Sequence, residues 1–225
     1  MAKAVRRYLP FLLIALALMI LPWLGLNPFY THLGINLGIY VILAISMDLL
    51  VGFSGQTSLG HAAFYALGAY ASGLLAVRLG FPVWLSIPCA AVIGAVITGL
   101  LGMPLMRVSG FYLAMLTIAF DLLTMTLIDQ WPALTGGVNG LYNIPSPTMG
   151  NFFVLGARLN HRGYYYVVWV LAALAFIFQR RFVNSFMGRA LVAIEGSPLA
   201  ASAMGINVAR YRWTTFVLSG TLAAI

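Results

Sequence analysis

The sequence predicts an all-α protein, a polytopic bundle of about seven transmembrane helices that is interrupted by a discontinuous glycine-rich segment near 52–61. Two observations lead to this prediction. Of the 225 residues, 62% are hydrophobic and only 7% are charged, whereas a soluble domain carries about 25% charged residues. The apolar residues also gather in runs close to the ~20 residues that a helix needs to cross a bilayer. We therefore expect a single transmembrane domain over 1–225.

The apolar runs define the spans in chain order. They place helices at 8–26, 31–51, 61–79, 83–102, 110–128 and 164–179. Basic residues precede the first run as in a signal peptide, but the run is long enough to span and no small-residue cleavage site follows it. A seventh helix begins near Trp213 and has too few residues to finish before Ile225, so we expect a C-terminally truncated domain.

The distribution of basic residues predicts the orientation, because cytoplasmic loops carry an excess of Lys and Arg. With the N-terminus inside, the cytoplasmic side holds Lys3, Arg6, Arg7, Arg107, Arg180, Arg181, Arg189, Arg210 and Arg212. The outer side holds only Arg78, Arg158 and Arg162. The segment 129–163 is then an outward loop and 180–212 an inward loop. Topology and anionic lipid thus account for the net charge of +8, which argues against a nucleic-acid partner.

The glycine-rich stretch from Gly52 to His61 lies between two long apolar runs. At membrane depth, non-helical backbone is tolerated only where it is buried in protein or lines a water-filled cavity, and an interrupted hydrophobic segment is the best pointer to a transport site. We therefore interpret the stretch as the wall of a solute path. The candidate path residues, with one carboxylate from a later helix, are Ser54, Gln56, Thr57, Ser58, His61 and Asp121.

These candidates carry alternatives. Gln56, Thr57 and Ser58 are the stronger ones, because they can hydrogen-bond a solute weakly. A lone histidine at a helix start, such as His61, is more often a hydrogen-bonded structural residue. A carboxylate inside a membrane costs about 2.5–3.5 kcal/mol, so Asp121 is expected to be paired across helices or to lie in a wet cavity. Asp48 either lines the path or makes a structural contact to the glycine-rich stretch.

The sequence lacks the residues that an enzyme would need. It has four acidic residues, one cysteine (Cys89) and no paired His and Asp, so hydrolysis and metal chemistry have little to work with. It has no glycine-rich phosphate loop that ends in Lys-Ser/Thr. We therefore predict no enzyme activity, no metal site and no bound cofactor, and any ATP must be used by another chain.

The inward loop contains a short predicted helix. Ser197 is a good N-cap and Pro198 fits the first helical position. Residues 199–204 favour helix, and Gly205 can adopt the left-handed conformation that ends it. Two turns are too short to be stable alone in water, so the helix needs a partner. Either it docks in a groove of another protein, or the loop folds back on its own membrane domain.

Several motifs resemble a known family. Ala200, Ala201 and Gly205 resemble the Glu-Ala-Ala-xxx-Gly loop of ATP-binding-cassette importer permeases, with Leu199 in place of the glutamate. Most of the chain, over 31–220, also resembles the LivM-like branch of these permeases, which serves branched-chain amino acids. The stretches that carry this second resemblance are 55–64, 68–70, 107–120 and 135–141.

The resemblance implies a permease subunit of an ATP-driven importer of branched-chain amino acids in the bacterial inner membrane. It implies as partners a homologous LivH-like permease subunit, two ATP-binding subunits and a periplasmic substrate-binding protein. The segment 129–163 becomes a periplasmic loop and 180–212 a cytoplasmic coupling loop. The residues expected to couple this loop to an ATP-binding subunit are Glu195, Ser197, Pro198, Leu199, Ala200, Ala201 and Gly205.

Two alternatives stay open at this point. The same machinery could import urea or short amides, because importers of these solutes also resemble the family. A secondary transporter driven by an ion gradient could use Asp48 and Asp121 to carry protons or Na⁺. The inward loop favours the ATP-driven importer, since a secondary transporter does not need a docking helix.

Overall fold

The computed structural model describes residues 28–105, 108, 110–145 and 161–225. In these residues the protein is built from helices, and no strand occurs among them, so the predicted all-α class is confirmed. The helices are α2 (Pro28–Ser54), α3 (His61–Arg78), α4 (Val83–Leu105), α5 (Phe111–Gln130), α6 (Pro132–Thr135), η2 (Gly137–Asn139), α7 (His161–Val183), α8 (Phe186–Gly196), α9 (Pro198–Ala203) and α10 (Val208–Ala223).

Four of these helices, α2, α4, α5 and α7, are long and apolar enough to cross a membrane. They confirm the spans predicted at 31–51, 83–102, 110–128 and 164–179. The helices α3 and α10 stand where two further spans are predicted, but they have only 18 and 16 residues. The helix predicted at 8–26 lies outside the described residues, so seven spans are not all established.

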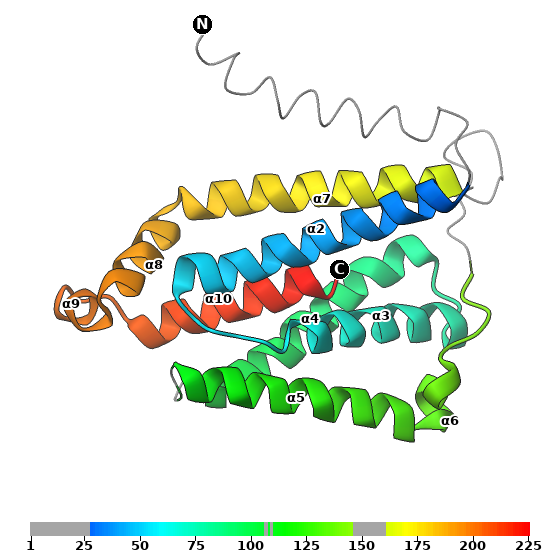
Figure 1. Ribbon diagram of the computed structural model, residues 1–225, viewed down its shortest axis with the longest axis horizontal. Coiled ribbons are helices and arrows are strands. Elements are labelled where there is room, and N and C mark those ends of the chain that lie inside the picture. Colours follow the sequence, from blue (N-terminus) through cyan, green and yellow to red (C-terminus); the bar gives the residue numbers. More distant parts are fainter. Residues whose placement is uncertain (1–27, 106–107, 109, 146–160) are drawn as a thin grey trace, which may run out of the picture.

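Helix α10 occupies the middle of the bundle. It packs against α2, α3 and α4 along its length and contacts α8 and α9 near its start. Figure 1 shows α7 lying along α2 on one side of α10, with α3 and α4 on the other and α5 at the far edge. The bundle is therefore organised around the last helix of the chain.

Small residues allow α10 to approach its neighbours. A Cβ atom on Gly68 of α3 would collide with the backbone oxygen of Ala224, and one on Gly94 of α4 would collide with the Ala224 side chain. From the other direction, a Cβ atom on Gly220 of α10 would collide with the side chain of Thr98. Glycine lets helix backbones come this close because it has no side chain.

The pair α2 and α7 meets in the same way. A Cβ atom on Gly34 would lie 2.5 Å from a ring carbon of Tyr165, and one on Gly38 would lie 2.5 Å from a methyl carbon of Val168. The Tyr165 side chain is only 1% exposed. Near the other end of the same pair, Gln179 of α7 donates a hydrogen bond of 2.6 Å to the carboxylate of Asp48.

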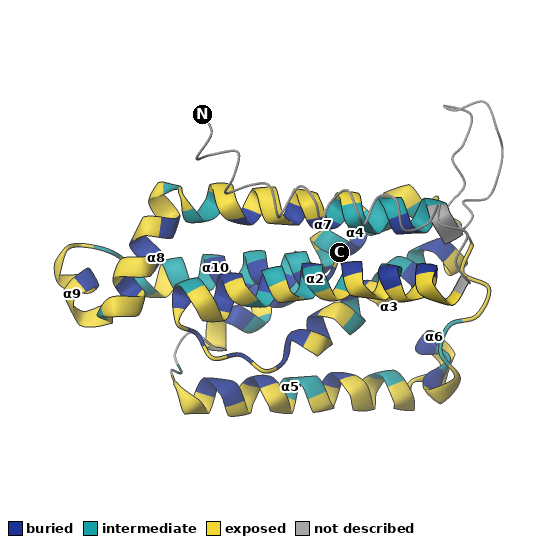
Figure 2. Cartoon of the chain, turned by 45° about the horizontal axis from the view of Figure 1, so that its top comes forward, coloured by how far each residue is buried: buried dark blue, intermediate teal, exposed yellow. Residues whose placement is uncertain are grey.

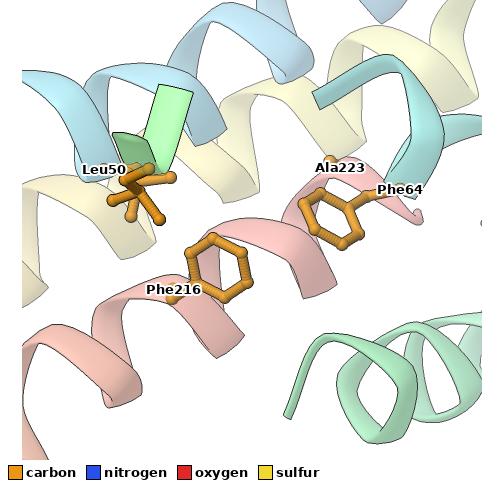
Figure 3. Packing of buried hydrophobic residues seen from close by; sticks show 5 residues of the cluster. Leu50, Phe64, Phe216 and Ala223 are labelled. Atoms are coloured by element: carbon orange, nitrogen blue, oxygen red, sulfur yellow. The ribbon is translucent and has the colours of Figure 1, made fainter. Parts of the chain in front are cut away.

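An apolar cluster fills the space between α2, α3, α5 and α10. Its buried members are Leu50, Phe64, Leu113, Phe216 and Ala223, and Figure 3 shows side chains of this cluster coming from several helices. The rings of Phe64 and Phe216 meet edge to face with their centroids 5.6 Å apart. This geometry is the one that aromatic pairs prefer, and it joins the start of α3 to the middle of α10.

Two loops differ in the amount of helix they contain. In the predicted inward loop 180–212, α7 continues to Val183, the unpredicted helix α8 follows, and α9 forms at the position expected for the short helix. In the predicted outward loop 129–163, α6 and η2 form two short helices, and residues 146–160 lie outside the described part of the chain. The guanidinium of Arg78 donates to the backbone oxygens of Ala133 and Leu134, which ties this outward loop to the end of α3.

We predict that Gly68→Ala destabilises the fold and that Gly99→Ala does not. The added methyl group at Gly68 collides with backbone of α10, whereas at Gly99 its nearest neighbours lie 3.7 Å away. Overpacking typically costs about 1–3 kcal/mol. The measurement is the midpoint of thermal unfolding of the full-length protein in detergent. Equal midpoints for the two variants would contradict the close approach of α3 and α10.

Candidate functional site

Within the glycine-rich stretch, residues 55–60 take the chain from α2 to α3 without a helix. Helix α2 runs three residues beyond the predicted end, to Ser54, and α3 begins at His61. Gly55 has a φ of +61°, in the left-handed region that glycine adopts readily. The residues between, 55–60, run back along the bundle, and α3 begins only part-way along it (Figure 1).

On one side this segment contacts α5 at two levels. The Thr57 hydroxyl donates to the backbone oxygen of Gly110 over 3.0 Å, and the Leu59 amide donates to the Thr117 hydroxyl over 3.0 Å. A Cβ atom on Gly60 would collide with the backbone oxygen of Thr117. Gly110 and Thr117 are seven residues apart, which corresponds to about 10 Å along a helix. The segment therefore has contacts spread over about two turns of α5.

On the other side the segment contacts α10, again at two levels seven residues apart. The Gln56 side-chain amide donates to the backbone oxygen of Arg212 over 3.1 Å. The His61 Nε2 atom lies 2.9 Å from the Ser219 hydroxyl, which in turn donates to the backbone oxygen of Ser46 over 2.5 Å. The segment is thus held between α5 and α10, and its polar groups are satisfied in part by polar residues of those helices.

Burial alternates along the segment, as expected for extended backbone. Ser54, Gln56, Ser58 and Gly60 are buried, whereas Thr57 and Leu59 are exposed and face a hollow of about 430 Å³ bounded by α2 and the start of α5. Of the five predicted path residues in this stretch, only Thr57 is exposed at the surface of the single chain. Ser54, Gln56, Ser58 and His61 face its interior, and their contact with solute stays a prediction.

The two carboxylates inside the helices have different surroundings. Asp48 accepts a hydrogen bond from Gln179 of α7, and its carboxylate lies beside Gly52 one turn further along α2. This contact is structural, but its hydrogen-bond partner is α7 and not the glycine-rich stretch. Asp121 lies half-buried at the middle of α5 and makes no hydrogen bond or ion pair to the residues that the structure describes. A role for Asp121 in the path stays a prediction.

The predicted coupling helix forms as α9 and is largely exposed (Figure 2). The Ser197 hydroxyl accepts the Ala200 amide over 3.3 Å, which confirms the N-cap, and Gly205 adopts a φ of +81° after the helix. Leu199 and Met204 are each 83% exposed. Ala201 is the buried residue of the helix, so most of its surface is left for a partner.

The helix before it, α8, reaches back to the glycine-rich stretch. A Cβ atom on Gly55 would lie 3.3 Å from Cγ of Glu195, so the Glu195 side chain packs against the first turn of that stretch. The loop that contains α9 therefore contacts the candidate path at two points, through Glu195 of α8 and through Arg212 of α10.

Sequence reasoning missed the residues that hold the segment in place. Thr117, Ser219 and Ser46 all lie inside apolar helices. The Thr117 hydroxyl accepts the Leu59 amide, the Ser219 hydroxyl contacts His61, and the Ser46 carbonyl accepts the Ser219 hydroxyl. A polar residue inside an apolar helix is the signal that could have drawn attention to the first two. The backbone oxygens of Arg212 and Gly110 carry no such signal.

The described residues contain no group of three or more His, Cys, Asp and Glu side chains that could hold a metal ion. Two other hollows, of about 410 and 480 Å³, have mostly apolar linings. Neither is lined by a set of convergent polar groups of the kind that small-molecule sites use.

Comparison with known proteins identifies the family. A family model described as "Branched-chain amino acid transport system / permease component" matches residues 30–225. This chain belongs to that permease family. The high-affinity branched-chain amino acid transport system permease protein LivM of Escherichia coli (strain K12) is 32% identical to this permease over 82% of the chain. The match covers 48% of LivM.

Further relatives of this permease lie in neighbouring transport systems. The high-affinity branched-chain amino acid transport system permease protein LivH of Escherichia coli (strain K12) is 27% identical over 85% of the chain and 66% of its own length. The ribose import permease protein RbsC of Haemophilus influenzae is 25% identical over 83% of the chain and 52% of its own length. The chain thus spans about half the length of LivM and RbsC. No solved structure matches it.

Together with the four apolar spans, family membership makes this permease a multi-pass membrane protein. The prediction of a LivM-like permease is confirmed at the level of the family. The candidate site is a non-helical segment held between α5 and α10, with a short exposed helix at one end of the bundle.

We predict that Thr117→Val loosens the segment and that Thr126→Val does not. Both residues lie on α5, but Thr117 accepts the Leu59 amide, whereas exposed Thr126 bonds only to its own helix. The net loss of one such hydrogen bond costs about 0.5–1.5 kcal/mol. Hydrogen exchange of the Leu59 amide should accelerate severalfold in Thr117→Val alone. An unchanged exchange rate would contradict this contact.

Proposed function

We propose that this permease is a membrane-spanning subunit of an ATP-driven importer that moves branched-chain amino acids across the bacterial inner membrane. The family match supports the transport role, and the exposed helix α9 carries the ATP-driven part of the proposal. The partners would be a homologous permease subunit, two ATP-binding subunits that use the ATP, and a periplasmic substrate-binding protein.

The charges of the described residues support a cytoplasmic location for α9 and, with it, for the N-terminus. The end of the bundle that carries α8 and α9, where α7 ends and α10 begins (Figure 1), holds Arg180, Arg181, Arg189, Arg210 and Arg212. Arg78 is the last residue of α3, whose end points toward the other end of the bundle. This is the asymmetry that the positive-inside rule relates to the cytoplasm. An ATP-binding subunit would then meet α9 on the side where ATP is available.

The proposed mechanism is alternating access. Leu199 and Met204 would enter a groove of an ATP-binding subunit, in the manner of an amphipathic helix in a hydrophobic groove. Movement of α9 would shift α8 and the first turn of α10, which contact the glycine-rich segment through Glu195 and Arg212. In this way, closure of the ATP-binding subunits would open or shut the path near 52–61.

The proposed path residues are suited to weak binding. Ser54, Gln56, Thr57, Ser58 and His61 are uncharged hydrogen-bonding groups apart from any protonation of the histidine. A path needs contacts that are favourable enough for entry and weak enough for release. The substrate-binding protein would select the solute, and the permease would contact it only transiently.

One observation keeps an ion-driven alternative worth testing. Asp121 is a carboxylate at the middle of an apolar helix without a partner among the described residues, and such groups often mark ion or proton pathways. In that alternative, uptake would follow an ion gradient instead of ATP. Import of urea or short amides by the ATP-driven machinery is the other alternative.

The decisive measurement is uptake by the complete importer, with the full-length protein and its partners in proteoliposomes. We expect labelled leucine, isoleucine or valine to enter only when ATP is supplied to the ATP-binding subunits. Collapse of proton and Na⁺ gradients should leave the rate unchanged, and urea and acetamide should not enter. Uptake that persists without ATP but stops with the ion gradients would refute the proposal.

We predict that Gly205→Val uncouples ATP hydrolysis from uptake, whereas Gly205→Asn retains most of the coupling. Gly205 has a φ of +81° and free space around its Cβ position, so the substitutions differ in backbone strain and not in steric contact. Asn tolerates the left-handed region and a β-branched residue does not. The ratio of transported solute to hydrolysed ATP should fall at least about tenfold in Gly205→Val. Equal ratios in both variants would contradict a coupling role for this turn.

A further inference from the structure

Three buried polar atoms in the glycine-rich segment lack hydrogen-bond partners among the described residues. They are Oε1 of Gln56, Oγ of Ser58 and Nδ1 of His61. The three side chains are only 3%, 1% and 8% exposed, respectively. Buried polar groups are hydrogen-bonded in the great majority of proteins, so three unpartnered atoms within six residues require an explanation.

Two of these atoms lie at one interface, which we call the α10 seam. It is formed by Gln56 and His61 on one side and by Arg212 and Ser219 of α10 on the other. Gln56 and His61 each contact α10 directly. Ser58 lies between them in the chain, and its side chain is 1% exposed and also borders the hollow of about 430 Å³. The Nε atom of Arg212, at the end of the seam, is also buried without a partner.

The hydrogen bonds fix the character of two of the unpartnered atoms. The single hydroxyl proton of Ser219 is donated to the backbone oxygen of Ser46, so His61 Nε2 must carry the proton of its own bond to Ser219. His61 Nδ1 is then a bare acceptor. The Gln56 amide nitrogen donates to Ser54 and Arg212, which leaves Oε1 as an acceptor. Ser58 can accept as well, so the groups missing from the segment's side of the seam are hydrogen-bond donors.

The opposite face of the segment is exposed instead of buried. Thr57 and Leu59 are exposed beside the hollow of about 430 Å³, and the Thr57 hydroxyl already has a partner at Gly110. That face is already accessible without any movement of the segment. The α10 seam is closed, and its polar atoms would become accessible to a solute if the segment and α10 moved apart.

We propose that the α10 seam is the closed form of the solute path, that it opens between residues 56–61 and α10, and that its acceptors then bind the ammonium group of the solute. The proposal rests on the proposed function and names α10 as the second wall of the path. An ammonium group supplies three N–H donors, which suits a row of neutral acceptors. Neutral acceptors hold a cation more weakly than carboxylates do, which permits release.

The test uses cysteine accessibility, for which the chain is convenient because its one cysteine can be removed as Cys89→Ala. In that background Ser58→Cys probes the seam and Ser219→Cys probes its α10 wall. Thr57→Cys is the exposed control, and Thr98→Cys, buried between α4 and α10, is the closed control. The complete importer in proteoliposomes is treated with a methanethiosulfonate reagent that carries an ammonium group, and with its sulfonate counterpart.

We expect the ammonium reagent to modify Ser58→Cys at least tenfold faster in one of two states, nucleotide-free or trapped with ATP and vanadate, than in the other. Ser219→Cys should follow the same pattern. Thr57→Cys should react in both states within threefold, and Thr98→Cys in neither. The ratio of the reaction rate with the ammonium reagent to that with the sulfonate reagent should be severalfold higher at Ser58→Cys than at Thr57→Cys.

The outcomes separate this proposal from the proposed function. If the unsubstituted importer takes up amino acid with ATP while both seam variants stay unreactive or react equally in the two states, the opening of the seam is refuted and the function stands. If the seam opens but the ratio of the ammonium to the sulfonate reaction rate is the same at Ser58→Cys as at Thr57→Cys, the ammonium assignment is refuted. If the unsubstituted importer shows no ATP-dependent uptake, both are refuted.

Discussion

The structure depends on how six residues of non-helical backbone are accommodated beside apolar helices. Lipid offers no hydrogen-bond partners, so the segment 55–60 is stable only because α5 and α10 supply them. Each helix contacts the segment at two levels seven residues apart, at Gly110 and Thr117 on α5 and at Arg212 and Ser219 on α10.

The central position of α10 follows from the same requirement. Two helices must stand close to the segment, and α10 must also pack against α3 and α4. It does so through Gly68, Gly94 and Gly220, each of which has no room for a side chain. The result is a helix whose start contacts the α8–α9 region and whose middle contacts the glycine-rich segment. Few other arrangements would let one helix touch both.

Local features of the sequence predict much of the fold, and contacts between distant residues account for what is missed. Apolar runs set the positions of α2, α4, α5 and α7, and the Ser197-Pro198 cap with Gly205 set α9. The glycine-rich stretch is recognisable because its polarity contrasts with its surroundings. By contrast, Gln56 contacts α10 at a residue more than 150 positions away, and no local pattern encodes that contact. Helix α8 was missed because its apolar residues are too few to resemble a span.

The division between open and closed faces of the segment bears on how such a path could work. If all its polar side chains faced a permanent channel, water and ions would pass freely. Here the segment presents Thr57 to the outside of the chain and keeps Gln56 and His61 against α10. At residues 56–61 this closed face is held by a few hydrogen bonds, each worth a net ~0.5–1.5 kcal/mol. Just beyond them, the edge-to-face contact of Phe64 with Phe216 holds α3 to α10. Separation at 56–61 alone therefore breaks only hydrogen bonds, whereas a wider opening also has to break this aromatic contact.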